Sequence, residues 1–171
     1  KDPSALVRLS HDEVAPSLEV GDQFLIDDAF VEMKVVAKNK KTITLEATED
    51  CVIKHKKGVN LPAKDIDLPS LIEDDLKKLD LASQNAVDFI GLSFVRTRKD
   101  IDILRAEMDK RKISAKVIAK IENQKALDNL EDIILASDAV MIARGDLGVE
   151  TPIEQLAYWQ KRMINLCRTH H

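Results

Sequence analysis

The stretch that decides the fold is Lys116-Val117-Ile118-Ala119-Lys120-Ile121-Glu122, a run rich in β-branched residues and of strand length. Two further runs of strand length, Val87–Phe94 and Ala139–Arg144, lie before and after it in the chain. The run Val87–Phe94 is too continuously apolar for a half-exposed strand and is typical of a strand covered on both faces. We therefore expect three strands in the second part of the protein.

The segments around these three strands carry apolar residues at helical spacing. The positions are Ile72, Leu76, Leu79 and Ala86 before the first strand, Ile101, Leu104 and Met108 after it, Leu127, Leu130 and Ile134 after the second, and Leu156, Trp159, Met163 and Leu166 after the third. Strands that alternate with helices run parallel, and their crossovers are right-handed. The pattern predicts an α/β fold with four helices and three parallel strands, as an open sheet or part of a barrel.

Two of the expected helices carry a sequence signal for their first turn. Ser70 with Glu73 and Thr151 with Glu154 both have the spacing of a capping box. Pro152 stands where the first helical residue is expected, a position that favours proline. We predict that Ser70 and Thr151 cap these helices.

The first part of the chain has a different pattern. The short runs Gln23–Ile26, Val31–Val35 and Thr42–Glu46 are separated by turn-like segments, and the second and third alternate between apolar and polar residues. Such alternation is typical of a small antiparallel sheet or barrel with one face in water. Leu-Pro recurs within Leu61–Pro69, which indicates a domain boundary nearby.

Composition excludes several classes of protein. The 171 residues carry 26 Lys and Arg against 30 Asp and Glu, a net charge of −4, with only 4% aromatic residues, so nucleic-acid binding has no support. We find neither a membrane-spanning apolar run nor a signal peptide, and we expect a soluble intracellular protein. Cys51 and Cys167 form no metal-binding pattern and are expected to be ordinary buried thiols. The chain begins without Met and stops inside a predicted helix, so we expect an excerpt of a longer protein.

Unusual chemistry lies at the ends of two predicted strands. Lys120 and Glu122 are two residues apart on one strand, so both side chains point to the same face. The third strand runs into Gly145-Asp146-Leu147-Gly148. A buried ion pair and a turn-capping aspartate would account for these residues structurally. Together, two carboxylates also suit Mg²⁺ or Mn²⁺, and a phosphorylated substrate would suit both the metal and the ammonium.

These residues also carry a resemblance to a known family. Lys116–Asn123, Ala136–Asp138 and Met141–Glu150 resemble the core signature of the pyruvate kinases, and Lys56–Pro62 and Ser93–Arg96 resemble further segments in matching order. The resemblance implies that residues 1–58 are the later part of a small antiparallel β lid domain. Residues 59–171 would then be the central part of a (β/α)₈ TIM-type barrel.

The same resemblance implies an activity, which is transfer of a phosphoryl group from phosphoenolpyruvate to ADP to give pyruvate and ATP. Lys120 would be the catalytic lysine and would contact the substrate, while Glu122 and Asp146 would hold Mg²⁺ (or Mn²⁺). Gly145 and Asp146 would bind the substrate carboxylate through backbone N–H groups, and Lys57 would bind the nucleotide phosphates. The K⁺ ligands would lie outside this chain, and the full-length enzyme would be a cytoplasmic homo-oligomer, a tetramer, without nucleic-acid or membrane partners.

The sequence departs from the family pattern at three places. Ala29 follows Asp27-Asp28 where the family often has glycine, Gln124–Ala126 replaces an acidic residue and a glycine, and Ala139 replaces a common glycine. Two other functions stay open: a Mg²⁺-dependent aldolase or lyase of pyruvate or phosphoenolpyruvate, and a non-catalytic binding module. By the resemblance, the first and later barrel strands and the C-terminal domain of the family lie outside this chain, so we expect the chain to be inactive alone. Three barrel strands leave open edges and an exposed inner face, so we also expect it to be marginally stable or associated with other chains.

Overall fold

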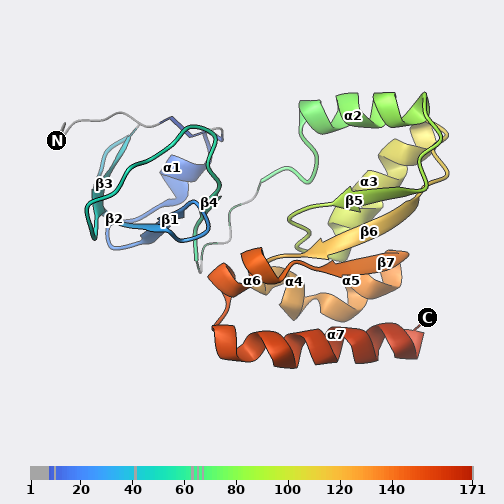
Figure 1. Cartoon of the computed structure of the whole chain (residues 1–171). Helices are drawn as coiled ribbons and strands as arrows, with labels where there is room; N and C mark the ends of the chain where they lie inside the picture. The colour runs from blue at the N-terminus through green and yellow to red at the C-terminus, as the bar shows by residue number, and fades with distance from the viewer. Residues whose placement is uncertain are drawn as a thin grey trace. The chain divides into compact units, whose positions relative to one another are not determined.

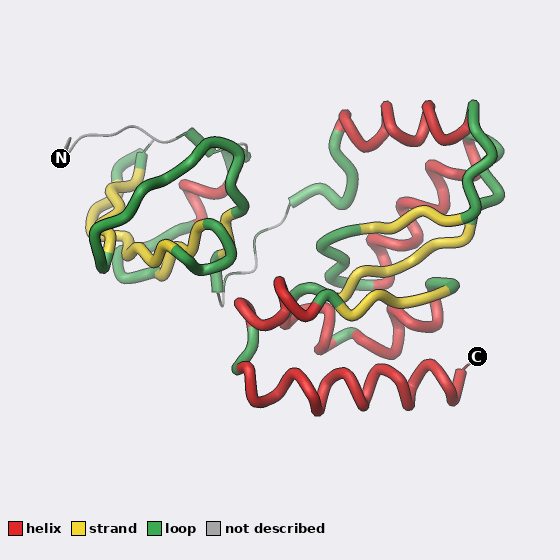
Figure 2. The backbone as a smooth tube through the Cα atoms, in the orientation of Figure 1, coloured by secondary structure: helices red, strands yellow, loops and turns green. Residues whose placement is uncertain are grey.

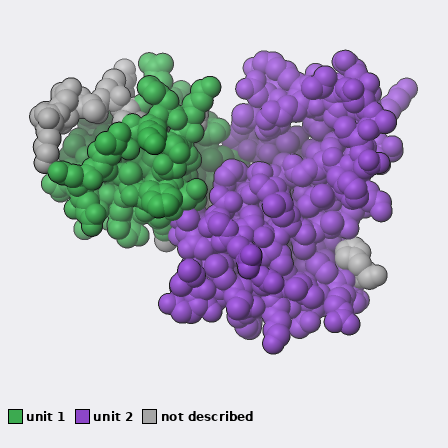
Figure 3. All heavy atoms as spheres, in the orientation of Figure 1, with its two compact units in different colours: residues 1–68 green, residues 69–171 purple. Residues whose placement is uncertain are grey.

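A computed structural model describes residues 8–9, 11–40, 42–62, 64, 66 and 68–170. The chain divides into two compact units, Lys1–Leu68 and Pro69–His171, which Figure 3 distinguishes by colour. Each unit has its own apolar core, and each is described by itself below.

The first unit is built on an antiparallel sheet of order β3-β2-β1-β4 (Figure 1). Its strands are β1 (Gln23–Ile26), β2 (Val31–Lys38), β3 (Ile43–Ala47) and β4 (Val59–Asn60), and a short helix, α1 (Val14–Ser17), precedes them. Buried and exposed residues alternate at the start of β2, as its sequence predicts. The antiparallel sheet expected for this part of the chain is therefore present, and its core contains Val14, Leu18, Phe24, Ile26, Val31, Met33 and Val35.

The turn between β1 and β2 has an uncommon backbone. Asp27, Asp28 and Ala29 all have positive φ, at 58°, 56° and 66°. This conformation favours glycine because a Cβ crowds the following carbonyl. Glycine would adopt the backbone of Ala29 without this crowding, and the alanine adopts it at a cost.

The second unit contains a parallel sheet of order β5-β6-β7, as its sequence predicts (Figure 2). The strands are β5 (Phe89–Leu92), β6 (Lys116–Ile121) and β7 (Ala139–Ile142). The helices are α2 (Glu73–Ser83), α3 (Arg98–Lys110), α4 (Gln124–Asp128), α5 (Leu130–Ala136), α6 (Arg144–Glu150) and α7 (Leu156–His170), with a 3₁₀ turn at Ile153–Gln155. The single helix expected after β6 is thus two, because the backbone leaves helical geometry at Asn129.

The two faces of this sheet differ. Val117, Ala119 and Ile121 on one face of β6 are fully buried in a core that α3, α5 and α7 share with the sheet. On the other face Phe89 is 57% exposed and Met141 is 50% exposed. The expectation that the first strand is covered on both faces is therefore wrong for this chain, whereas the expected exposed inner face is present.

Both predicted helix caps are wrong as well. The Asp75 carboxylate accepts from the Ile72 N–H at the start of α2, and the Ser70 hydroxyl donates to Asp100 instead. The buried Thr151 hydroxyl donates to the Leu147 carbonyl, so it ends α6 instead of beginning α7. In both cases the hydroxyl of the predicted cap residue donates to an acceptor outside the helix turn that the local pattern predicts.

Three further expectations concern the domain boundary, the thiols and membrane-spanning helices. The first unit ends at Leu68, within the Leu61–Pro69 segment where the sequence indicates a boundary and ten residues beyond the limit at residue 58 that the resemblance implies. Cys51 is exposed, in a loop after β3, so the expectation of a buried thiol is wrong for it, while Cys167 is partly buried. Within the described residues, no helix has the length and apolar character needed to cross a bilayer.

Candidate functional site

The centre of the candidate site is an ion pair at the carboxyl end of β6. Lys120 and Glu122 lie on the same face, as their spacing predicts, and Lys120 Nζ is 2.5 Å from Glu122 Oε1. The Glu122 side chain is only 2% exposed, whereas that of Lys120 is 26% exposed. The carboxylate is therefore fixed inside the protein, while the ammonium group reaches toward solvent.

The loop after β5 supplies the other partners of this pair. Lys120 Nζ donates to Ser93 Oγ at 2.8 Å, and the Phe94 N–H donates to Glu122 Oε2 at 2.6 Å. Phe94 adopts φ 54°, a left-handed conformation that is strained for a large side chain, and the residue is 63% exposed. Such strain costs roughly 1–3 kcal/mol and persists only where neighbouring contacts hold it.

Asp100, near the start of α3, holds this loop from behind. Its Oδ2 accepts from the N–H groups of Arg96 and Thr97, both at 2.8 Å, and its Oδ1 accepts from the Ser70 hydroxyl at 2.5 Å. Burial alone would raise the pKa of Asp100, but these hydrogen bonds and the Arg96 guanidinium outweigh it and lower the pKa. Asp100 is therefore a buried carboxylate that is stable in its charged form.

Two asparagine side chains also bind the loop. Asn123 Nδ2 donates to the Val95 carbonyl at 3.0 Å, and Asn129 Nδ2 donates to the Arg96 carbonyl at 3.3 Å. Asn123 also caps α4 by accepting from the Ala126 N–H at 2.8 Å. The end of β5 is therefore tied to the end of β6 by both backbone and side-chain contacts.

Gly145 and Asp146 lie in the first turn of α6, directly after β7. The Leu147 N–H donates to the carbonyl of the cap residue Ala143 at 2.9 Å, and the N–H groups that precede it in the first turn of a helix have no acceptor within the helix. Such N–H groups favour anions. Among the described residues, none makes a hydrogen bond or ion pair with the Asp146 side chain, and no direct bond joins it to Lys120 or Glu122.

The donor set suits a hard divalent cation. Glu122 and Asp146 offer carboxylate oxygens from the ends of neighbouring strands, the ligand type that Mg²⁺ and Mn²⁺ prefer. The described residues contain no cluster of three or more His, Cys, Asp and Glu side chains. Water and substrate oxygens would therefore have to complete the coordination, as is usual for Mg²⁺.

Lys57 belongs to the first unit. Its Nζ lies 2.8 Å from Asp27 Oδ1, and both side chains are about one-third exposed, at 35% and 33%. The Asp27 N–H in turn donates to the Gly58 carbonyl at 3.0 Å. The ion pair therefore connects the segment before β4 with the left-handed turn after β1.

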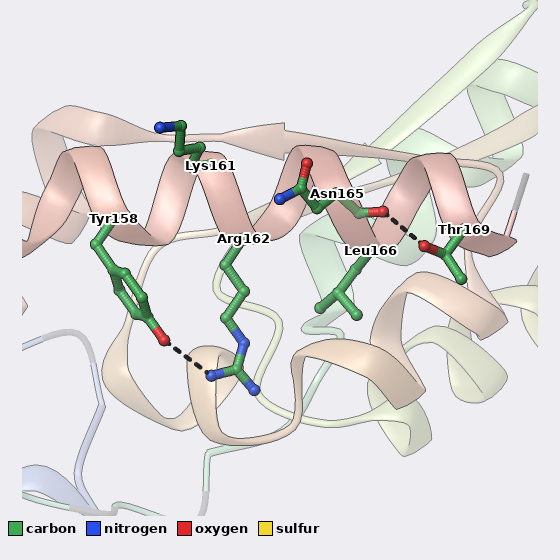
Figure 4. Close-up of a pocket in the computed structure, with 6 residues that line it drawn as sticks. All are labelled: Tyr158, Lys161, Arg162, Asn165, Leu166 and Thr169. Atoms are coloured by element: carbon green, nitrogen blue, oxygen red, sulfur yellow. Dashed lines mark hydrogen bonds between the residues drawn. The ribbon is translucent and has the colours of Figure 1, made fainter.

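A hollow elsewhere in the second unit contains none of these residues. It runs along α7 and is lined by Tyr158, Lys161, Arg162, Asn165, Leu166 and Thr169. Tyr158 and Arg162 point to the same side of the helix and are joined by a hydrogen bond of 3.3 Å, while Lys161 points away (Figure 4). No carboxylate, histidine or cysteine is among the residues that line the hollow.

The sequence of this chain matches a known protein family. The model of the pyruvate kinase barrel domain matches residues 2–171. The chain belongs to the pyruvate kinase family. Pyruvate kinases of Corynebacterium efficiens and Mycobacterium tuberculosis are 42% and 41% identical to it over 162 and 161 residues, and that of Staphylococcus aureus is 36% identical over 161. These matches cover 95%, 94% and 93% of this chain but only 34%, 33% and 28% of the relatives.

The family assignment confirms the predicted architecture. The parallel sheet and its helices are part of a pyruvate kinase barrel, and the antiparallel sheet before it corresponds to part of the lid. The chain spans about a third of the length of the curated pyruvate kinases named above.

Sequence reasoning missed three contributors to the site. Ser93 and Phe94 lie in a segment that resembles the family, but the sequence predicts no role for them, and it predicts none for Asp100. Thr97 and Asp100 have the spacing of a capping box, which could have indicated an anchored helix start. Nothing in the local sequence indicates that this helix start supports Glu122.

Proposed function

We propose that this chain supplies part of the site that transfers a phosphoryl group from phosphoenolpyruvate to ADP, giving pyruvate and ATP. The observation that carries the proposal is Lys120, held between Glu122 and Ser93 at the carboxyl end of a barrel strand. Active sites of (β/α)₈ barrels lie at this end of the strands. Membership of the pyruvate kinase family supports the same reaction.

Lys120 would stabilise the negative charge on the transferring phosphoryl group and on the developing enolate. Phosphoryl transfer depends mainly on positioning and on electrostatic stabilisation, and an ammonium group on a rigid strand provides both. Ser93 accepts one N–H of Lys120 and Glu122 pairs with its charge, so the group is oriented before the substrate arrives.

Glu122 and Asp146 would hold the divalent cation, Mg²⁺ or Mn²⁺. When bound, the cation supplies positive charge that polarises substrate oxygens. Glu122 is buried and accepts a backbone N–H at its second oxygen, which fixes the direction of the first. Asp146 contributes a carboxylate that no described residue engages.

The substrate carboxylate would bind the N–H groups of Gly145 and Asp146 at the first turn of α6. Lys57 would contact the nucleotide phosphates from the first unit, exchanging its bond to Asp27 for one to phosphate. K⁺ would be bound by residues outside this chain. The full-length protein would be a cytoplasmic homo-oligomer, a tetramer by family resemblance.

A Mg²⁺-dependent aldolase or lyase is the second candidate from sequence. A carboxylate pair on neighbouring strand ends would serve it equally well. The ammonium of Lys120 beside Glu122 and the antiparallel unit before the barrel favour phosphoryl transfer instead. A binding module without turnover would also keep this geometry.

The test is an assay of pyruvate formation from phosphoenolpyruvate and ADP with Mg²⁺ and K⁺, performed on the 171-residue chain and on the full-length protein that carries it. We expect turnover in the full-length protein and none in the chain alone. Absence of turnover in both, with phosphoenolpyruvate and Mg²⁺ still bound, would contradict the proposal and favour the other two functions. Cleavage of an added 4-hydroxy-2-oxo acid into pyruvate and an aldehyde, without formation of ATP, would identify an aldolase.

A further inference from the structure

The loop of residues 93–97, between β5 and α3, controls the orientation of the Lys120–Glu122 pair. Ser93 accepts a hydrogen bond from Lys120, and the Phe94 N–H donates to the Glu122 oxygen that does not face the lysine. Partners of this kind fix the direction of a metal-ligating carboxylate, and their loss weakens metal binding. The position of this loop therefore matters for the site.

The loop does not hold its shape by local preference. Phe94 has a left-handed backbone and is a mostly exposed residue, so burial of its side chain does not compensate for the strain. The restraint comes from Asp100, whose side chain is only 7% exposed and which accepts from the consecutive N–H groups of Arg96 and Thr97. The Ser70 hydroxyl binds the other oxygen of Asp100.

These contacts exceed what a helix cap requires. A capping acid at the third helical position needs to accept only the N–H of the cap residue, here Thr97. Asp75 accepts one backbone N–H at its helix, that of Ile72, and its other oxygen accepts from the side chain of Lys78. Asp100 also binds the N–H of Arg96, one residue further into the loop. Its bonds therefore extend along the backbone toward Phe94.

We propose that Asp100 is a positioning residue, which anchors the loop so that the Phe94 N–H and the Ser93 hydroxyl hold Glu122 and Lys120 in place. It acts through the backbone and does not touch substrate or metal. The inference rests on the proposed function for its chemistry, since it takes Glu122 as a ligand of the divalent cation. Its physical content, the orientation of that ligand, is measurable by metal binding without turnover.

The experiment compares Asp100→Asn and Asp100→Ala with the control Asp138→Asn in the full-length protein. Asp138 is a matched carboxylate at the opposite end of the same strands, where it accepts from the Val117 N–H at 2.7 Å and from Arg105 at 2.8 Å. Asparagine keeps one oxygen for the loop N–H groups but turns an NH₂ group toward the remaining donors, and alanine keeps no acceptor. The effect should therefore increase from Asn to Ala.

The probe is Mn²⁺, with its dissociation constant measured by electron paramagnetic resonance. We expect Asp100→Asn to raise that constant about tenfold, the lower end for loss of an outer-shell partner, and Asp138→Asn to leave it within about twofold. Amide exchange at Phe94 in metal-free protein should become faster in the Asp100 variants alone. Stability measured by urea unfolding provides the comparison, because both carboxylates support the fold.

An unchanged Mn²⁺ constant in the folded Asp100 variants would overturn the inference, and so would a wild type that binds no Mn²⁺. Equal weakening in the Asp138 control, at equal loss of stability, would also overturn it, because the role would then be structural only. If Asp100→Ala does not fold, Asp100→Asn and Ser70→Ala decide, the latter with an increase of about threefold. If Asp100→Asn raises the Mn²⁺ dissociation constant tenfold but the wild type shows no turnover, the inference is supported and the proposed function is contradicted. If the wild type turns over and the Asp100 variants bind Mn²⁺ as the wild type does, the proposed function is supported and the inference is contradicted.

Discussion

At the scale of single residues, Lys120 allows charge stabilisation to be separated from metal binding. We expect Lys120→Met in the full-length protein to lower turnover by about 10²–10³-fold or more, the usual effect of removing one group that stabilises transition-state charge. Mn²⁺ binding should be unchanged or tighter, because the ammonium that pairs with Glu122 is gone. Turnover assays and Mn²⁺ titrations measure the two effects.

Lys116→Met is the matched control for this change. Lys116 begins β6, on the same face as Lys120 but at the amino end of the strand, so its loss should leave turnover almost unaltered. Asp146→Ala, which removes a carboxylate, should weaken Mn²⁺ binding as well as turnover. Near-normal turnover in Lys120→Met would show that the lysine is not catalytic.

Ala29 offers a second prediction at this scale. At φ 66°, the Cβ of Ala29 destabilises the folded state by roughly 1–2 kcal/mol. Glycine would remove this cost, but it would also give the unfolded chain more conformational freedom, which offsets about 0.4–1 kcal/mol of the stabilisation. Ala29→Gly should therefore stabilise the first unit by roughly 0.5–1 kcal/mol, measured as slower amide exchange in β2. Ala47→Gly, in the extended strand β3, should instead destabilise it. Faster exchange in Ala29→Gly would mean that the strain is compensated elsewhere.

At the scale of elements, the sequence predicted what depends on apolar periodicity. The strands β6 and β7 were expected at nearly their observed limits, and the i, i+2 spacing of Lys120 and Glu122 correctly placed both on one face. The predicted cap at Ser70 is wrong because its hydroxyl donates to Asp100, thirty residues away. The predicted cap at Thr151 is wrong because its hydroxyl donates to the Leu147 carbonyl of the preceding helix. The hydrogen bond from Phe94 to Glu122 spans 28 residues, so no local pattern could predict it.

Asp138 joins two elements and makes their stability depend on pH. The pKa of Asp138 lies below the ordinary value of 3.8, because its carboxylate accepts hydrogen bonds from the Val117 N–H in β6 and from Arg105 in α3. Burial raises the pKa, but these bonds outweigh it. A carboxyl with a lowered pKa contributes stability above its ordinary pKa, and that contribution is lost as the pH falls through the folded-state pKa. The stability difference between wild type and Asp138→Asn should therefore be largest near neutral pH.

That difference should shrink progressively as the pH falls below about 4. Urea unfolding followed by fluorescence of Trp159, the single tryptophan of the chain, measures it in the second unit. Asp75→Asn, at the exposed start of α2, provides a comparison at a helix end with no strand attached. A pH-independent difference for Asp138→Asn would show that its carboxyl is not preferentially charged in the folded state.

At the scale of the whole molecule, the inner face of the parallel sheet decides how the chain behaves on its own. Phe89 and Met141 align with Lys116 and Lys120 in the strand register, so all four lie on that face. In a closed barrel, side chains from the other strands fill this space. No described element of the second unit covers it, and exposed apolar surface of this kind promotes association.

We therefore expect the 171-residue chain to self-associate and the double variant Phe89→Ser, Met141→Ser to do so more weakly. Sedimentation velocity over a range of concentrations measures the difference. Tyr158→Ser is the control, because Tyr158 is as exposed as Phe89, both at 57%, but lies on the outer helix α7. If the control weakens association and the double variant does not, the contact surface is α7. A wild-type chain that stays monomeric throughout would show that the uncovered face is tolerated in water.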